Sequence, residues 1–383
     1  MKEYHNYRYQ YFIMNKVEDK LLDILRYEVL AQDRTDNNTI SLEESKQLLR
    51  LAKEHTVQGV VANAVVNNKI HIVTQQAQES DRKMIIYDFV MFDMIQKHHY
   101  ENYKQALVDF ASLMNKYHIP YVIFKGMAVA QFYPSPYSRS MGDVDFYVPS
   151  SHFMQAVDVI EKHWQVTIER DEIEKHYCFD FHGIRFEMHY KIETFGSVKH
   201  QKYFNQMIDI TFSKTTSFSL NGIEIAMLPV VEDLIVVFKH WFNHLLLEGI
   251  GLRQTLDLAV LLNAYKDKID VALLQKHLQA IGYWKAFKAM VAMMEQYFGL
   301  LSADYYCNLE KNDYCYGNKL LQVVLESGNF GRKKYKTLVP GTKKSMETAK
   351  RTFVHYVKFF WLAPIDILFL IPKRIRITMK KRK

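Results

Sequence analysis

The chain has 383 residues, of which 49% are hydrophobic, and carries a formal net charge of +8 at pH 7. This length predicts two or three structural units, and the apolar content is sufficient for buried cores. An odd count of three cysteines without metal-type pairs argues against a disulfide scaffold and fits a reducing cytoplasm.

The N-terminal part of the chain is predicted to be helical as far as Pro120. Residues 41–44 read Ser-Leu-Glu-Glu, a capping box that opens a helix. Apolar residues between Phe110 and Tyr117 recur at i, i+3, i+4 and i+7, and Pro120 then ends the helix. The first twenty residues lack the apolar core of a signal peptide. We therefore expect a helical region over residues 1–118.

Two aspartates separated by one residue follow in the central part of the chain. The run Asp143–Val148 is predicted to be a strand, in which residues i and i+2 point to the same face. Asp143 and Asp145 therefore converge on one spot. Mg²⁺ prefers carboxylate oxygens and is usually held by one or two carboxylates plus substrate phosphates. The spacing indicates a divalent-metal site. Without other motifs nearby, the alternative for such a pair is a solvated strand edge.

A third carboxylate follows on a predicted hairpin formed by Cys178–Phe181 and Ile184–Tyr190. Alternation puts Glu187 and His189 on the polar face of the second strand, from which Glu187 can reach the two aspartates. Three acids can share two metals, which stabilise the attacking and leaving oxygens of a phosphoryl displacement. His189 either acts directly or braces a carboxylate by hydrogen bonding.

Together these motifs resemble the polymerase-β-like nucleotidyltransferases, in which a glycine turn opens a helix, an Asp-x-Asp strand follows, and a lone acid lies on a later strand. The segments Phe124–Gly126, Met141–Val148 and Phe186–Tyr190, together with Arg139, more narrowly resemble a group of uncharacterised bacterial nucleotidyltransferases. The similarity is anchored in residues 121–190. It predicts that Gly126 starts the helix Met127–Phe132, where free N–H groups favour an anion.

The resemblance implies roles for individual residues. Asp143, Asp145 and Glu187 would be the catalytic acids and the ligands of a two-metal Mg²⁺ site that Mn²⁺ can also fill. Gly126 would let the backbone approach the nucleotide phosphates. The superfamily usually has Gly-Ser or Gly-Gly in this turn and a shorter gap to the acids, so Lys125 or Arg139 would replace the missing hydroxyl with positive charge. An exposed strand end and a surface ion pair are the alternatives for these two residues.

Helical periodicity returns from Pro229 onward. The run Leu234–Leu247 carries His240 and His244 at i and i+4, which is zinc-like spacing, but the glutamate that zinc proteases have next to the first histidine is absent. Four residues are similar to positions that face the cleft in the helical region of the family. The resemblance implies that they contact the nucleotide or the acceptor, and the alternative is that they form surface pairs or pack within the helices. The four residues are Lys239, His240, Arg253 and Asp257.

The C-terminal segment is apolar and then basic. Phe359–Ile371 is 13 residues long and broken by Pro364 and Asp366, whereas a spanning helix needs about 20 apolar residues. Pro372–Lys383 holds seven basic residues and no acid. Three interpretations stay open: peripheral contact with an anionic membrane through Phe359–Lys383, a last helix docked on the core with a cationic end, and nucleic-acid binding.

The sequence thus predicts an α+β protein with a small mixed-sheet nucleotidyltransferase core over residues 119–228. Helical regions flank it at 1–118 and 229–383, the latter with the basic tail. The predicted activity is Mg²⁺-dependent transfer of a nucleoside monophosphate from an NTP to an acceptor hydroxyl, with pyrophosphate release. The acceptor (small molecule, sugar, protein side chain or RNA end) and the oligomeric state are left open. Alternatives are a catalytically silent nucleotide-binding or membrane-associated scaffold and toxin-like tRNA modification. A cytoplasmic location is expected, with peripheral contact at the inner membrane face as an option.

Overall fold

The structure is a computed structural model that describes residues 14–32, 39–75, 78–170, 176–300, 307–331 and 342–371. Contacts between Cα atoms divide the chain into two compact units, each assembled from separate segments. Unit 1 comprises Met1–Asp93, Asn243–Ala259 and Trp284–Leu362. Unit 2 comprises Met94–Phe242, Val260–Tyr283 and Ala363–Lys383. The fold class is α+β, as predicted.

Unit 1 is largely helical. Asn15 and Ser41 cap its first two helices through capping boxes, so the capping box predicted at residues 41–44 is confirmed. Strand β1 (Thr39–Ser41) pairs in parallel with β2 (His71–Val73). The helices of this unit are α1 (Lys16–Leu30), α2 (Leu42–His55), α3 (Gln58–Val66), α11 (Trp284–Phe298), α13 (Lys311–Ser327) and α15 (Thr342–Phe359). Three further helices contribute residues to both units: α4 (Glu79–Lys116), α8 (Val230–Leu247) and α9 (Leu252–Tyr265).

Unit 2 contains a mixed sheet of six strands in the order β5-β6-β4-β3-β8-β7. Strand β4 runs parallel to β6 and antiparallel to β3, which in turn runs parallel to β8. Strands β5 and β6 form the predicted hairpin. The strands are β3 (Val122–Phe124), β4 (Val144–Tyr147), β5 (His176–Phe181), β6 (Ile184–His189), β7 (Thr216–Leu220) and β8 (Ile223–Met227).

The hairpin of β7 and β8 is an element that the sequence analysis did not predict. Its turn is formed by Asn221 and Gly222, both with positive φ (50° and 79°). Asn-Gly between alternating strands is the strongest short-range hairpin signal, because type I′ turns need positive φ at both central residues. The two strands are only five residues long each, so the turn carries the clearer signal.

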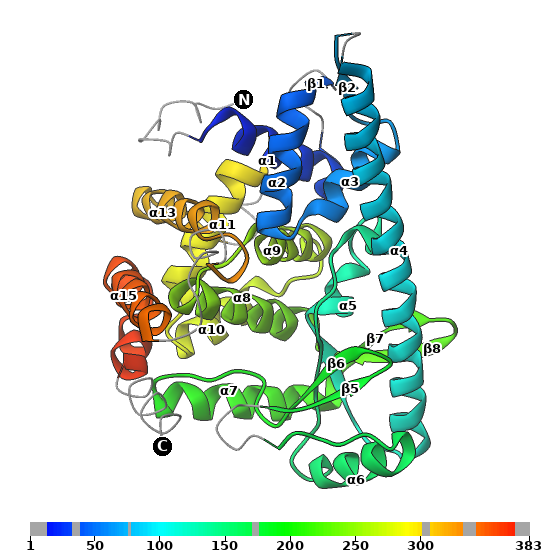
Figure 1. Cartoon of the computed structure of the whole chain (residues 1–383). Coiled ribbons are helices and arrows are strands. Elements are labelled where there is room, and N and C mark those ends of the chain that lie inside the picture. The colour runs from blue at the N-terminus through cyan, green and yellow to red at the C-terminus, as the bar shows by residue number, and fades with distance from the viewer. Residues whose placement is uncertain are drawn as a thin grey trace. The chain divides into compact units, whose positions relative to one another are not determined.

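One face of the sheet carries the hydrophobic core of unit 2. Helices α4 and α6 (Phe153–Trp164) cover this face (Figure 1), and Phe110 of α4 lies 4.5 Å from the ring of Phe146 and 5.8 Å from that of Phe186. Because alternate residues of a strand face opposite sides, Val144 and Phe146 enter this core. The residue between them, Asp145, is thereby directed to the other face.

Unit 2 also contains α7 (Val198–Thr211), α10 (Val271–Ala280) and a C-terminal helix over residues 364–371. The buried carboxylate of Asp366 in that helix accepts hydrogen bonds from the backbone N–H groups of Gly196 (2.6 Å) and Ser197 (3.0 Å), at the start of α7. It also accepts one from the Tyr283 hydroxyl and lies 3.8 Å from Lys239 Nζ. This cluster, which we call the Asp366 cluster, joins the C-terminal helix to the rest of unit 2.

Within the described residues, no helix combines the length and the apolar character needed to cross a membrane. This agrees with the interruption of the C-terminal apolar segment by Pro364 and Asp366.

Candidate active site

Strand register brings the predicted acids together in unit 2. Asp145 of β4 lies directly opposite Glu187 of β6, and Asp143 immediately precedes β4. The side chain of Asp145 is 3% exposed and that of Glu187 is 20% exposed, whereas Asp143 is exposed. Parallel pairing of two alternating strands therefore produces the shared face that the sequence predicted for these carboxylates.

Lys125 and His189 hold the Asp145 carboxylate. Lys125 Nζ lies 2.7 Å and His189 Nε2 2.9 Å from Asp145 Oδ1, so neither contact uses the second carboxylate oxygen. The same His189 nitrogen lies 3.5 Å from Glu187 Oε2, and the ring is fully buried. Of the two roles that the sequence left open for His189, the structure shows the bracing one.

The acids interact strongly with one another. The charge of Asp145 is the main cause that raises the pKa of Asp143 to about 6. Burial alone would raise the pKa of Asp145, but the Lys125 ammonium and the His189 ring outweigh it and hold this pKa well below its usual range. Burial would also raise the pKa of Glu187, but the hydrogen bond from His189 outweighs this effect and the pKa is lowered. The negative charge of the three acids therefore exceeds the positive charge of the cations beside them.

The turn that carries Lys125 is conformationally unusual. Lys125 has φ 61° and ψ −153°, and Gly126 has φ 39°. Such a backbone is sparsely populated for a residue with a side chain, and observed outliers of this kind cluster at functional sites. A Cβ on Gly126 would lie 3.4 Å from the Asp143 carbonyl oxygen, so the turn packs closely against the acids. Helix α5 (Gly126–Ala130) is one turn long, shorter than the predicted Met127–Phe132.

Two residues beside Lys125 complete the site. His240 Nδ1, on α8, lies 3.4 Å from Lys125 Nζ and 3.3 Å from Glu193 Oε1. Burial would lower the pKa of Lys125, but Asp145, Asp143 and Glu193 together raise it, which keeps the ammonium charged. His240 is one of the contacts predicted from the sequence, whereas Glu193 is not. Glu193 lies beyond the end of β6, outside any periodic pattern, so no local signal indicated its position.

The other residues predicted to contact the nucleotide are not among those that surround the Asp145 carboxylate. Arg139 is buried in the loop before β4 and donates to the Ser140 carbonyl oxygen at 3.4 Å. Lys239 is fully buried, with Nζ 4.6 Å and 4.7 Å from the ring centroids of Phe195 and Tyr283, and it belongs to the Asp366 cluster. This environment fits the packing alternative for Lys239. Nucleotide contacts by Arg139 and Lys239 stay predictions. The same holds for Arg253 and Asp257, which belong to unit 1.

The donor chemistry of the acids fits a hard divalent cation. Asp143, Asp145 and Glu187 offer only carboxylate oxygens, which Mg²⁺ and Mn²⁺ prefer. Ligand atoms of Asp145, Glu187 and His189 lie within 4.8 Å of one another. A cation there would also relieve the repulsion that raises the pKa of Asp143. Asp145 and Glu187 would therefore hold the metal, and Asp143, the residue before β4, would join them.

Comparisons with known proteins identify the family of the chain. A family model described as an uncharacterised nucleotidyltransferase matches residues 41–299, which include all three acids. Among solved structures, the crystal structure of an antigenic nucleotidyltransferase-like protein from Paracoccidioides brasiliensis is similar to this chain. The similarity covers 54% of this chain and 97% of that chain, with 12% sequence identity and a TM-score of 0.35. No curated protein matches the chain.

Proposed function

Because the chain belongs to a family of uncharacterised nucleotidyltransferases, we propose that it transfers a nucleoside monophosphate from an NTP to an acceptor hydroxyl in a Mg²⁺-dependent reaction. The acceptor oxygen forms a bond to the α-phosphorus as the bond to pyrophosphate breaks, and the hydroxyl proton passes to a site carboxylate. The observation that carries the proposal is the register of β4 and β6, which sets Asp145 opposite Glu187 and beside Asp143.

In this proposal the three acids hold the cation. When bound, Mg²⁺ would polarise the phosphate oxygens and favour ionisation of the acceptor hydroxyl. Asp143, whose pKa is raised to about 6, must lose its proton to serve as a ligand. His189 keeps Asp145 and Glu187 in fixed orientations through one ring nitrogen. Fixed ligands matter because misplacement of reacting groups by about 1 Å can cost a hundredfold in rate.

Lys125 would receive the nucleotide phosphates. Its ammonium is charged, 12% exposed, and held by Asp145 on one side and His240 on the other. An incoming phosphate would compete with Asp145 for this ammonium and release the carboxylate toward the cation. Glu193, which contacts His240 at 3.3 Å, would keep the imidazole in place during this exchange.

Calorimetric titration with each of the four NTPs, in Mg²⁺ and in EDTA, tests the proposal. We expect Mg²⁺-dependent binding by the wild type that is lost in the double variant Asp143→Asn/Asp145→Asn. Asp158→Asn, which removes an exposed carboxylate on α6, is the matched control and should bind as the wild type does. Binding that persists unchanged in the double variant or in EDTA would contradict the assigned site. Metal-independent binding without turnover would favour the catalytically silent scaffold.

A further inference from the structure

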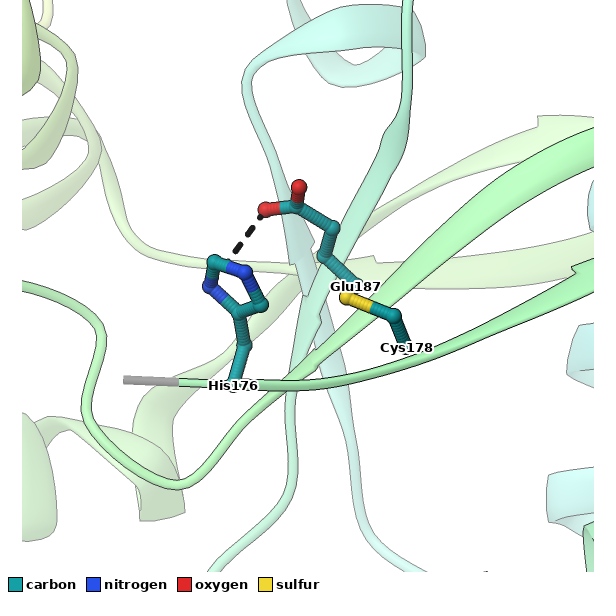
Figure 2. A group of neighbouring side chains, drawn as sticks. All are labelled: His176, Cys178 and Glu187. Atoms are coloured by element: carbon teal, nitrogen blue, oxygen red, sulfur yellow. Dashed lines mark ion pairs between the residues drawn. The ribbon is translucent and has the colours of Figure 1, made fainter. Parts of the chain in front are cut away.

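Strand β5 adds two metal-ligating side chains to the face that carries the acids. Cys178 lies directly opposite Glu187, and His176 lies opposite His189. His176 and Cys178 are two residues apart and therefore share one face of β5. Figure 2 shows these two side chains beside Glu187 of the neighbouring strand. One ligand atom from each of the three residues lies within 4.8 Å of the others.

The donors differ in kind from those of the three acids. His176 offers an imidazole nitrogen, Cys178 a sulfur and Glu187 a carboxylate oxygen, which is a set that suits Zn²⁺ and chemically similar metals rather than Mg²⁺. His176 Nδ1 lies 3.5 Å from Glu187 Oε2. Two such ligands around a tetrahedral Zn²⁺ are about 3.3 Å apart, because each bond is about 2.0–2.1 Å long. The Cys178 sulfur lies within 4.8 Å of a ligand atom of His176 and of one of Glu187.

The surroundings allow a cation to enter. His176, Cys178 and Glu187 are all partly exposed. The nearby guanidinium of Arg185 forms ion pairs with Glu169 and with Asp180, so its charge is compensated. The ring of His189 lies 4.9 Å from that of His176 and backs the site from the buried side. Three protein ligands would leave a fourth position for water or a substrate oxygen.

We propose that His176, Cys178 and Glu187 form a binding site for a borderline divalent metal such as Zn²⁺. Binding exchanges the thiol proton for the metal, so one proton leaves per ion bound. Because Glu187 also belongs to the three acids, an ion at this site removes a ligand from the Mg²⁺ set. Insofar as the proposed function holds, Zn²⁺ therefore acts as an antagonist of Mg²⁺-dependent nucleotide binding.

Titration of the full chain with Co²⁺, without nucleotide, tests the site directly. A thiolate ligand gives Co²⁺ a charge-transfer band in the near ultraviolet, so we expect this band in the wild type and its loss in Cys178→Ser. Cys315→Ser removes another partly exposed thiol and should keep the band. His176→Gln should keep the thiolate band but raise the Kd for Co²⁺ by about tenfold or more. No band in the wild type, or a band that survives Cys178→Ser, would overturn the proposal.

A second titration separates the metal site from the proposed function. Zn²⁺ should suppress Mg²⁺-dependent NTP binding in the wild type and in Cys315→Ser but not in Cys178→Ser. If no NTP binds at all, the proposed function fails while the Co²⁺ spectra still decide the metal site. Equal suppression in all three proteins would contradict the shared role of Glu187.

A separate observation concerns the outer face of the C-terminal helix over residues 364–371. Asp366, Ile367 and Leu370 are buried, whereas Ile365, Leu368 and Phe369 are 51%, 58% and 51% exposed. The exposed residues follow i, i+3 and i+4 spacing and form one apolar stripe. The chain continues into Pro372–Lys383, with seven basic residues and no acid, which leaves the other residues at 8 − 7 = +1. In the sequence, positive charge is therefore concentrated directly after the residues of the stripe.

We infer that this stripe rests on an anionic lipid surface. Apolar side chains enter the interface between headgroups and acyl chains, while adjacent Lys and Arg residues are attracted to anionic headgroups. Two weak signals of different kinds give more stable anchoring than either does alone. The arrangement provides both signals within one short segment of chain.

Cosedimentation with lipid vesicles tests this inference. The full chain should bind phosphatidylcholine vesicles that contain phosphatidylserine and should not bind pure phosphatidylcholine vesicles, and added salt should weaken the binding. Leu368→Glu/Phe369→Glu should reduce binding by about tenfold or more. Ile210→Glu, at a residue of α7 that is 68% exposed, should not reduce it. Failure to bind, equal binding to both vesicles, or binding of single-stranded RNA in their place would contradict the inference.

Discussion

Two buried aspartate–lysine pairs in unit 2 invite comparison. Asp145 is paired with Lys125 in the candidate active site, and Asp366 is paired with Lys239 at the start of α7. Both carboxylates are at most 3% exposed, and each also contacts a second ionisable side chain or hydroxyl. By burial alone the two carboxylates are equivalent.

Their surroundings differ in the balance of charge. Asp366 is surrounded by donors: two backbone N–H groups, the Tyr283 hydroxyl and Lys239. Asp145 shares its donors with two other carboxylates, and its charge raises the pKa of Asp143 to about 6. A balanced cluster stabilises the fold, whereas an excess of like charge costs stability unless a cation offsets it. This difference, rather than burial, separates the structural pair from the candidate site.

The largest effect on stability is expected from Asp366→Asn. The variant leaves Lys239 buried without its charged partner, and breaking a buried ion pair in this way costs about 3–5 kcal/mol. Urea denaturation followed by circular dichroism would measure the loss in free energy of unfolding. A cost below about 1 kcal/mol would show that the cluster is not structural.

Tyr283→Phe should have a smaller effect. It removes one hydroxyl that donates to the Asp366 carboxylate and leaves the ring in place. Hydrogen bonds to charged groups contribute about 1.5–3 kcal/mol, and the same denaturation measurement applies. Tyr297→Phe, which removes a hydroxyl bonded to the neutral Asn318 side chain, is a matched control and should cost about 1 kcal/mol.

Asp145→Asn should destabilise the metal-free protein less than Asp366→Asn does, although Asp145 is as deeply buried. Loss of the Lys125 partner is offset in part by relief of repulsion with Asp143 and Glu187. Metal-dependent NTP binding should nevertheless disappear. If this variant costs as much stability as Asp366→Asn, then the comparison between the two pairs fails.

The smallest effect is a pH dependence due to Asp143. Its pKa rises from an ordinary 3.8 to about 6 in the folded protein, so the native state binds more protons than the unfolded state in that interval. The contribution of this group to stability is therefore complete below pH 3.8 and is lost as the pH rises through about 6. Denaturation in EDTA across this range should show the slope in the wild type and not in Asp143→Asn. Mg²⁺ should lessen the slope, because a cation favours the ionised carboxylate.

Sequence patterns predicted those features of the site that depend on local periodicity. Alternation in β4 and β6 was enough to place Asp145 and Glu187 on polar faces, because a strand turns every second residue to the same side. The order of strands in the sheet is not a local property. His176 and Cys178 reach Glu187 only because β5 pairs with β6 in one register, and alternation within β5 does not determine that register.

Contacts between residues distant in sequence were harder to predict. Glu193 and His240 meet Lys125 through a loop and a helix that have no shared pattern. Asp366 was identified only as an interruption of an apolar segment, although it accepts hydrogen bonds from Gly196 and Ser197. Lys239 was predicted either to contact a nucleotide or to pack, and periodicity cannot separate these two roles for a helical residue.

The position of Asp366 also bears on the order of events during protein synthesis. Its carboxylate bonds to backbone groups 170 and 169 residues earlier in the chain. Domains generally form as the chain emerges from the ribosome, N-terminal parts first. Here the sheet of unit 2 is translated long before the residue that completes the start of α7. Final closure of this unit must therefore follow translation of the C-terminal helix, and a shortened chain that ends before residue 366 would never reach that step.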